Sequence, residues 1–466
     1  MIGELASAAA IGLARMIRAK QVSPVEVVEA ALARLARLEP SLNAFVTVTP
    51  ELALASARRA EATLMAGDDL PALAGLPVSV KDLIAVEGVR ATFGSRTLSD
   101  AVAPVDAPSV ERLRAAGACI LGKTTTSEFG CKPVGDSPLT GITRNPWDLT
   151  KTPGGSSCGA ASSVAAGITP FALGTDGGGS IRIPAAFTGL FGMKAQFGRV
   201  PVFPTSATPT LGHVAPIARR VRDAAWLLQV VAGFDARDPA SVSEPVPDFL
   251  AACDAPVKGM RIAWSPTLGY ARPTAEVAAV TTSAARVFED LGCHVEEVPA
   301  VMDDPVELWM SEFYAGIGTR LRRPLLEARS LLDPAVAEIL ERALEQSLER
   351  YYASVFQRYE LRERLRAFFE RYDLLVSPTL PVAAFDVGLN VPPELPDRGI
   401  VSWVSYTYPF NLTGQPAASL PCGITVGGLP VGLQLVARVN REVDILRAAA
   451  AFEAARPFPR LAELAR

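Results

Sequence analysis

Short apolar runs alternate with amphipathic helical patterns along most of this 466-residue chain, and this alternation constrains the fold more than any other feature. Val78–Val80, Cys119–Leu121 and Thr169–Leu173 have the length of buried strands, whereas Glu51–Leu64 and Val110–Ala116 have helical periodicity. Strands that alternate with helices are typical of a sheet covered by helices. The sequence therefore predicts an α/β fold.

Two other stretches of helical pattern are expected to pack beside the sheet. Ser23-Pro24-Val25-Glu26 has the pattern of a capping box and predicts a helix that ends before Pro40, within an N-terminal helical layer of about residues 1–65. About residues 305–371 are almost wholly helical in pattern and rich in arginine, which predicts a helical insertion over one edge of the sheet. No long linker or internal repeat divides the chain, so residues 1–466 are expected to form a single domain.

Composition excludes several classes of function. The 45 basic and 49 acidic residues form no block of like charge, so no nucleic-acid partner is expected. The chain has no long apolar run and no basic stretch at its start, which predicts a cytoplasmic protein that does not enter a membrane. Six scattered cysteines indicate free thiols, and the two histidines leave few options for a metal site or a histidine triad. No motif implies a metal or an organic cofactor.

Two glycine-rich stretches carry serines that suit catalysis. GGSSCG spans residues 154–159 and GGGSIR spans residues 177–182. Glycine allows main-chain N–H groups to approach a ligand closely, so N–H groups from Gly177 to Ser180 could bind an oxyanion while Ser180 attacks a carbonyl carbon. Lys81 ends an apolar strand, where burial would lower its pKa and make it a general base. Considered without the serines, the sequence around Lys81 also allows the alternative that the side chain extends from the strand end into water.

Four separated stretches resemble the motifs of the amidase signature family. They are ALAGLPVSVKD at 72–82, PGGSSCGAASSVAAG at 153–167, GTDGGGSIRIP at 174–184 with GMKAQFGRV at 192–200, and NLTGQPAASLPCG at 411–423. The resemblance covers nearly the whole chain. It implies a large mixed central β-sheet with α-helices on both faces, a signature core over about residues 70–200, and hydrolysis of amide carbon–nitrogen bonds.

The resemblance also implies a role for each of the catalytic candidates. Ser180 would be the nucleophile that forms an acyl-enzyme, Ser156 the cis-serine that relays protons, and Lys81 the terminal base. Lys81 and Ser156 lie 75 residues apart, and Ser156 and Ser180 lie 24 apart, as the family pattern requires. The oxyanion hole would be formed by the N–H groups of Gly177, Gly178, Gly179 and Ser180.

Residues next to the triad are expected to support it. Ser157 is predicted to hydrogen-bond within the network, and Asp176 and Arg182 to pair and hold the glycine loop, although Arg182 could instead reach the substrate. Cys158 stands where the family commonly has glycine, and we expect it to pack as a small apolar residue. Other groups offer competing assignments, which we consider weaker: Lys123, Lys151 and Lys194 as bases, and Ser157 as the nucleophile of a G-x-S-x-G elbow with His213 or His294.

Clusters of aromatic residues suggest the class of substrate. Trp309–Tyr314 in the helical insertion and Trp403–Phe410 before the last family motif suit an apolar or aromatic amide, although packing in the core explains such clusters equally well. The candidate pocket residues are Cys131, Trp309, Phe313, Trp403 and Tyr406. The expected partner is a small-molecule amide, and the sequence leaves a homodimer open.

Two other functions remain to be compared with amide hydrolysis. One is that of the glutamine-hydrolysing A-type component of a tRNA-dependent amidotransferase, which shares these motifs. That component typically has an acidic residue about seven positions before the Asn of its NLAG-like motif, and here that position is Val404. The other is a catalytically silent member of the family that serves for binding, which the retention of Lys81, Ser156 and Ser180 disfavours.

Overall fold

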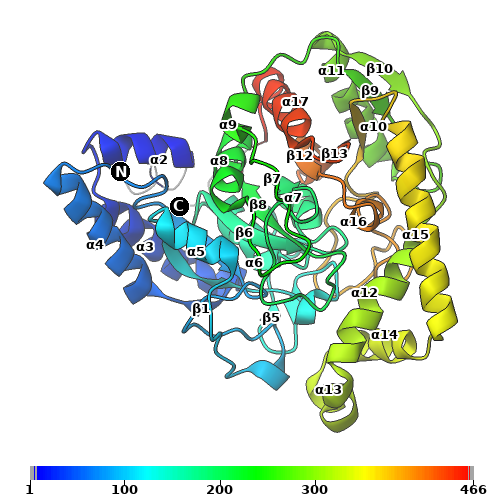
Figure 1. The fold of residues 1–466 in the computed structure, drawn as a ribbon, viewed down its shortest axis with the longest axis horizontal. Coiled ribbons are helices and arrows are strands. Elements are labelled where there is room, and N and C mark those ends of the chain that lie inside the picture. The colour runs from blue at the N-terminus through cyan, green and yellow to red at the C-terminus, as the bar shows by residue number, and fades with distance from the viewer. Residues whose placement is uncertain (1–4, 6–7, 460, 462–466) are drawn as a thin grey trace.

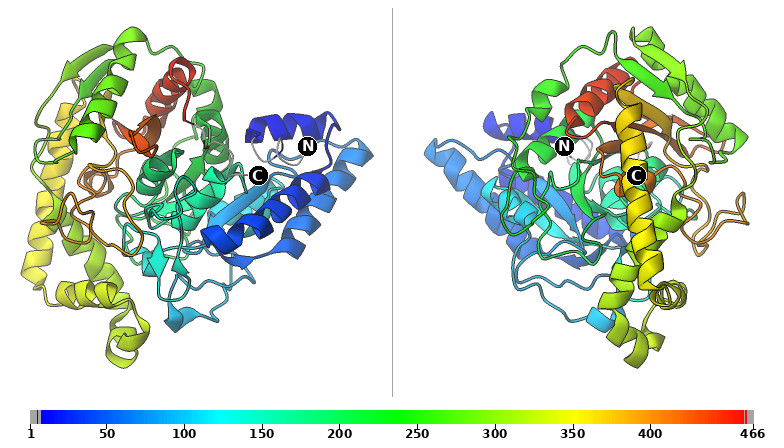
Figure 2. Two further views of the ribbon diagram at one scale, coloured as in Figure 1. Left: turned by 180° about the vertical axis from the view of Figure 1, so that it is seen from behind. Right: turned by 45° about the vertical axis from the view of Figure 1, so that its right-hand side comes forward.

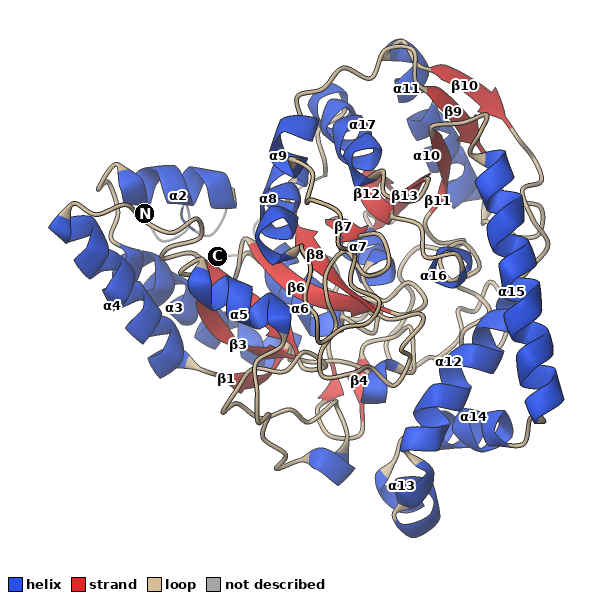
Figure 3. Cartoon of the chain, in the orientation of Figure 1, coloured by secondary structure: helices blue, strands red, loops and turns tan. Residues whose placement is uncertain are grey.

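A single mixed sheet of 11 strands forms the centre of the computed structural model, which describes residues 5, 8–459 and 461 (Figure 3). The strand order is β1-β3-β2-β6-β8-β7-β12-β13-β11-β9-β10, with β2 parallel to β3 and β6 and most central pairs antiparallel. The α/β fold with a large mixed sheet is confirmed. The strands are β1 (Phe45–Val48), β2 (Pro77–Lys81), β3 (Cys119–Thr124), β6 (Phe171–Asp176), β7 (Phe191–Lys194), β8 (His213–Ala218), β9 (Arg261–Trp264), β10 (His294–Glu297), β11 (Leu374–Pro378), β12 (Ala417–Ile424) and β13 (Pro430–Ala437). The short strands β4 (Asp136–Ser137) and β5 (Gly141–Ile142) form a separate hairpin sheet.

Helices cover both faces of the sheet. Successive residues of a strand point to opposite faces, and in β6 the side chains of Phe171 and Leu173 pack in one apolar cluster while Ala172 packs in another. The first cluster includes helix α8 (Val221–Val231), and the second includes α6 (Cys158–Ala165). This burial on both sides explains why the central strands are continuous apolar runs. The other helices around the sheet are α5 (Pro108–Ala115), α7 (Arg182–Thr188), α9 (Phe249–Ala252), α10 (Ala275–Ala285), α11 (Val287–Asp290), α16 (Pro409–Leu412) and α17 (Glu442–Ala455).

The N-terminal segment is helical, with α2 (Ala10–Arg18), α3 (Pro24–Leu42) and α4 (Pro50–Ala66), and α3 and α4 pack side by side (Figure 1). Ser23 and Glu26 form the predicted capping box. The predicted end before Pro40 is wrong, because α3 continues to Leu42. A proline removes one hydrogen bond to the preceding turn, and here only the last turn is affected before Asn43 ends the helix in a left-handed conformation. Residues 1–4 and 6–7 of the expected N-terminal layer lie outside the described residues.

The part of the chain that connects β10 to β11 forms an outer layer of four helices (Figure 1). They are α12 (Val306–Arg320), α13 (Arg322–Glu327), α14 (Pro334–Leu344) and α15 (Leu348–Phe368). Trp309, Leu340 and Leu361 from this layer share an apolar cluster with Ala263 of β9 and Leu375 of β11. The layer therefore packs against the sheet and brings α12 toward the centre of the molecule. Across the described ranges, none of the helices combines the length and hydrophobicity needed to cross a bilayer.

Candidate active site

The order of the strands brings the predicted triad residues together. Lys81 is the last residue of β2, and Ser180 follows the end of β6, which is parallel to β2 and adjacent to it. The carboxyl ends of adjacent parallel strands meet at the same edge of a sheet. Ser156 lies just before α6, which packs against both strands. Residues far apart in sequence therefore converge at one end of two neighbouring strands.

Lys81 lies in direct contact with two hydroxyl groups. Its Nζ donates to Ser156 Oγ at 2.7 Å and to Thr175 Oγ1 at 2.8 Å. Lys81 is wholly buried, Ser156 is 1% exposed, and the Gly155–Ser156 peptide bond is cis. The structure thus joins the lysine to the first of the two predicted serines, and places Thr175 beside them.

Burial gives Lys81 an unusual acidity. The loss of hydration disfavours its charged form and lowers its pKa from the ordinary value of 10.5 to about 7, and the neighbouring Cys158 and Asp176 offset only part of this effect. A lysine with a pKa near 7 is substantially neutral at neutral pH. It can therefore accept a proton from the hydroxyl that it touches. The alternative in which Lys81 extends into water is excluded.

Ser180 lies on the more open side of this group. Ser180, Thr175 and Gly177 are partly exposed, in contrast to the buried Lys81 and Ser156. The N–H of Ser157 donates to the carbonyl oxygen of Ser180 at 3.2 Å, which ties the two serine segments together. Ser180 Oγ makes no hydrogen bond to any residue that the structure describes. The nucleophile candidate is therefore held by its main chain and leaves its hydroxyl accessible.

Ser157 supports the site through the end of β6. Its Oγ donates to the carbonyl oxygen of Thr175 at 3.1 Å and accepts from the N–H of Thr175 at 3.3 Å. Ser157 thereby positions the residue whose hydroxyl contacts Lys81. The prediction that Ser157 hydrogen-bonds within the network is confirmed, and its engaged hydroxyl argues against Ser157 as a nucleophile.

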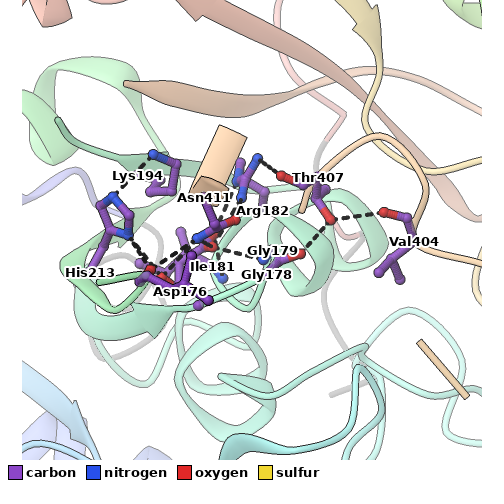
Figure 4. A network of polar contacts seen from close by, with 12 residues as sticks. Asp176, Gly178, Gly179, Ile181, Arg182, Lys194, His213, Val404, Thr407 and Asn411 are labelled. Atoms are coloured by element: carbon purple, nitrogen blue, oxygen red, sulfur yellow. Dashed lines mark hydrogen bonds and ion pairs between the residues drawn. The ribbon is translucent and has the colours of Figure 1, made fainter. Parts of the chain in front are cut away.

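The glycine loop after β6 differs from the predicted oxyanion hole at one position. The N–H of Gly179 donates to Asp176 Oδ1 at 2.7 Å, and the N–H of Ile181 donates to Asp176 Oδ2 at 3.3 Å (Figure 4). Gly179 is therefore not free to donate to a ligand, because the Asp176 carboxylate already uses its hydrogen. The N–H groups of Gly177, Gly178 and Ser180 have no partner in the described part of the chain.

Asp176 and Arg182 form a wholly buried ion pair that holds this loop, with 3.0 Å between Arg182 Nη2 and Asp176 Oδ1. Arg182 also donates to Asn411 Oδ1 at 2.7 Å and to the carbonyl oxygen of Thr407 at 2.8 Å (Figure 4). Burial alone would raise the pKa of Asp176, but the Arg182 charge and its hydrogen bonds outweigh burial and hold that pKa well below the usual range. All the nitrogens of Arg182 are engaged, so the structural pair is confirmed and Arg182 is not available to a substrate.

His213 and Lys194 contact each other and the main chain, and neither forms a hydrogen bond with the candidate serines among the described residues. His213 Nδ1 lies 2.8 Å from the carbonyl oxygen of Leu211 and 3.1 Å from that of Asp176, while Lys194 Nζ lies 3.3 Å from His213 Nε2 (Figure 4). Burial lowers the pKa of both side chains well below their ordinary values. His213 is thus a neutral structural residue, as predicted.

The other candidate lysines are engaged elsewhere. Lys123 Nζ lies 3.0 Å from Asp82 Oδ1 in a buried pair, and Lys151 pairs with Asp386 at the surface at 2.7 Å. Cys158 is buried, and its Sγ contacts the main chain and side chain of Thr125. Burial raises the pKa of the Cys158 thiol, so Cys158 packs as a small neutral residue, as expected.

Two aromatic residues of α12 pack directly on the glycine loop. Trp309 Nε1 donates to the carbonyl oxygen of Gly177 at 2.8 Å, and the Trp309 and Phe313 rings stack with centroids 4.5 Å apart. A Cβ added at Gly178 would lie 2.4 Å from the Trp309 ring, and one at Gly177 would lie 2.8 Å from the Phe313 ring. The glycines therefore provide room for these rings as well as free N–H groups.

The remaining candidate pocket residues have different surroundings. Trp403 is wholly buried against the rings of Phe187 and Phe385, and the Tyr406 hydroxyl donates to the carbonyl oxygen of Pro266. These two residues lie in the same buried apolar cluster as Trp309 and Phe313, and their assignment to the substrate pocket stays a prediction. Cys131 is also buried, but it follows Gly130, where an added Cβ would lie 3.3 Å from Ser156 Oγ.

Comparison with known proteins identifies the family. The model of the family named Amidase matches residues 26–446. An acylamidase of Rhodococcus erythropolis is 37% identical over 456 residues, which cover 96% of this chain and 95% of that protein. The chain belongs to the amidase signature family. It is an amidase, a hydrolase that acts on amide bonds.

Other relatives of this amidase show the range of the family. In Symbiobacterium thermophilum, the A-type component of the glutamyl-tRNA(Gln) amidotransferase is 37% identical over 480 residues, which cover 95% of each chain. The crystal structure of a bacterial aryl acylamidase of the same family superposes with a TM-score of 0.91 at 32% identity, covering 97% of this chain and 96% of the other. Sequence identity therefore does not separate the two functions, and the site must be compared directly.

Sequence reasoning missed three residues of this amidase that the structure brings to the site. Thr175 contacts Lys81, Thr407 donates to the carbonyl oxygen of Gly178, and Asn411 contacts both Asp176 and Arg182. Asn411 opens one of the family motifs, and Thr175 lies within another, so position in a motif was a usable signal for both. Thr407 lies outside the motifs and carries no such signal. No group of histidine, cysteine or acidic residues able to hold a metal ion occurs in the described ranges.

Proposed function

We propose that this amidase hydrolyses a small apolar or aromatic carboxamide through an acyl-enzyme on Ser180. The observation that carries this proposal is the contact of 2.7 Å between a buried Lys81 of lowered pKa and Ser156. A neutral lysine in this position is a general base that acts on the relay serine rather than directly on the nucleophile.

The reaction then proceeds in two halves. Neutral Lys81 accepts the Ser156 proton while Ser156 accepts the Ser180 proton, and Ser180 Oγ forms a bond to the carbonyl carbon. The tetrahedral intermediate collapses as the carbon–nitrogen bond breaks, and the protons return through Ser156 to the departing amine or ammonia. Water next attacks the ester on Ser180, with the same relay accepting and returning its proton. The products are a carboxylic acid and free Ser180.

We propose that the oxyanion is stabilised by the free N–H groups of the glycine loop. Those of Gly177, Gly178 and Ser180 are available, and the bond from Gly179 to Asp176 keeps the loop in place. Donors fixed in advance stabilise the negative charge without reorganisation, and each contributes about 10²–10³-fold to kcat in comparable enzymes.

The surroundings of the loop favour an apolar acyl group. The stacked Trp309 and Phe313 rings lie against Gly177 and Gly178 and offer apolar area rather than charge. Val404, where the amidotransferase component typically has an acid, is buried, and its carbonyl oxygen accepts from Thr407. An apolar residue there supplies no partner for the α-amino group of glutamine. The superposition with an aryl acylamidase supports the same substrate class.

Two measurements test this function. Ammonia or amine release is measured over a panel of aryl, aliphatic and amino-acid amides, and aryl amides are expected to give the highest kcat/KM. Preference for glutamine would instead support the amidotransferase function. A fluorophosphonate probe should label Ser180, and a chain that remains unlabelled would be a catalytically silent family member.

A further inference from the structure

The outer face of α15 carries a stripe of exposed apolar side chains. Leu348 is 73% exposed, Tyr352 50%, Phe356 64% and Tyr359 63%. Their spacings of four, four and three residues place all four on one face of a helix. The buried residues of α15, Ser354, Arg358, Leu361 and Leu365, lie on the opposite face. The right-hand view of Figure 2 shows this helix in front of the rest of the chain along its whole length.

The exposed apolar area of this stripe is larger than that of a single exposed apolar side chain. An aromatic side chain buries about 150–250 Å² when covered, so the exposed parts of the three rings and Leu348 amount to roughly 400 Å². The largest apolar patch on a typical monomer has about 300–600 Å² and is often functional, so the stripe is a candidate contact surface that its arrangement and charges must decide. Two such faces together bury roughly 800 Å² of apolar area, and charged flanks extend the contact toward the roughly 1,200 Å² of a small stable interface.

The charges beside the stripe are arranged for pairing with a second α15. Glu349 and Arg362 lie at equal distances along the helix from the midpoint between Tyr352 and Tyr359, which falls between Val355 and Phe356. Both side chains are exposed, and neither forms an ion pair with any described residue. If a second copy lies antiparallel about that midpoint, Tyr352 faces Tyr359 of the other copy and Glu349 faces Arg362.

A cavity at one end of α15 fits the same arrangement. It has a volume of about 690 Å³ and is lined by Tyr359, Arg362, Phe369 and Arg438, among others. The Arg362 guanidinium lies 5.9 Å from the centre of the Tyr359 ring, so the cavity adjoins the stripe. Its lining also includes Glu363 and Glu370, which pair with Arg366 and leave Arg362 as the arginine that faces the stripe without an acidic partner among the described residues. An antiparallel copy brings the opposite end of its own helix, with the apolar Leu348 and the acidic Glu349, to this cavity.

From these observations we propose that the amidase forms a two-fold homodimer through the outer face of α15. Each chain contributes the same stripe, Leu348, Tyr352, Phe356 and Tyr359, so that the interface is self-complementary. Two Glu349–Arg362 ion pairs, one on each side of the axis, set the antiparallel register. The interface lies on the face of α15 opposite to that which packs on the core, and the proposal does not depend on the substrate.

Analytical ultracentrifugation of the full chain tests the dimer. The expected mass is twice the 49.2 kDa of the chain at micromolar concentration. Phe356→Glu places a charge beside the two-fold axis and is expected to raise the dimer Kd by at least about 100-fold. The matched control is Phe234→Glu, because Phe234 is 57% exposed but lies outside the stripe. The control should remain dimeric, and circular dichroism should show that both variants are folded.

Exchange of charges tests the register. Glu349→Arg alone and Arg362→Glu alone should each weaken the dimer by about tenfold, because like charges then face each other. The double variant restores the pair in reverse and should recover the original Kd. A monomer at every concentration would overturn the proposal, as would a dimer that Phe356→Glu leaves intact. Failure of the double variant to recover would overturn the antiparallel register.

Discussion

Lys81 shows how a single burial event can determine a chemical role. Its side chain lies among apolar residues at the end of a strand, where water cannot stabilise a positive charge. In the proposed mechanism, this lowered pKa makes Lys81 the base at neutral pH in place of a histidine. His213, beside the glycine loop, is neutral and engaged with main-chain oxygens.

Removal of the base is the direct test at this scale. Lys81→Ala is expected to lower kcat by about 10⁴-fold, as for other members of catalytic triads. Lys151→Ala is the matched control, since Lys151 forms only a surface pair with Asp386. Steady-state hydrolysis of an aryl amide measures both. Equal activity of the Lys81 variant and the native chain would remove Lys81 from the mechanism.

The pKa of Lys81 predicts the dependence of activity on pH. The base acts only when neutral, and burial lowers its pKa to about 7. The value of kcat/KM should therefore rise with pH and level off above about pH 7, and it should fall about tenfold for each pH unit well below pH 7. The range from pH 5 to 9 extends about two units to either side of that pKa. A profile of kcat/KM that stays flat over this range would contradict the assignment of Lys81 as the base.

At the scale of elements, the glycine loop and helix α12 depend on each other. Gly177 and Gly178 have no Cβ, and the rings of Phe313 and Trp309 occupy the space that a Cβ would need. Helix α12 is about 130 residues further along the chain, and it determines the shape of a loop that carries the free N–H groups.

Gly178→Ala is expected to lower kcat by roughly 10²-fold, because the added methyl group collides with the Trp309 ring and displaces the oxyanion donors. Gly12→Ala is the control, since a Cβ at Gly12 meets no atom within 4 Å. Measurement of kcat and KM for both variants shows whether the loss of activity is specific to Gly178. Unchanged kcat in Gly178→Ala would show that the loop tolerates displacement.

At the scale of the whole molecule, Arg358 joins the outer helical layer to the segment next to the candidate active site. Arg358 of α15 lies 2.5 Å from Glu312 of α12 and donates to the carbonyl oxygen of Leu412, beside Asn411. Asn411 in turn contacts the Asp176–Arg182 pair. Packing of the outer layer and shape of the active site are therefore linked through one arginine.

Arg358→Met would leave the Glu312 carboxylate buried without its ion-pair partner. We expect the free energy of unfolding to fall by about 3–5 kcal/mol, the usual cost of one missing partner in a buried pair. Arg350→Met breaks the exposed pair with Glu307 and should cost less than about 1 kcal/mol. Urea unfolding followed by circular dichroism measures both, and equal losses would show that the buried pair has no special role.

The sequence by itself determined the type of fold and the family, and it named the candidates for the proposed chemistry. Strand-length apolar runs and helical periodicity are local properties, and motif spacing records which residues act together, so the α/β fold and the Lys81, Ser156 and Ser180 candidates were predictable. Tertiary structure decided everything that depends on contacts between distant segments. It engaged the N–H of Gly179 with Asp176, placed Thr175 against Lys81, and set Trp309 against the glycine loop while Trp403 stacks on Phe187. Local sequence cannot distinguish two buried tryptophans, because their roles follow from the neighbours that folding brings to them.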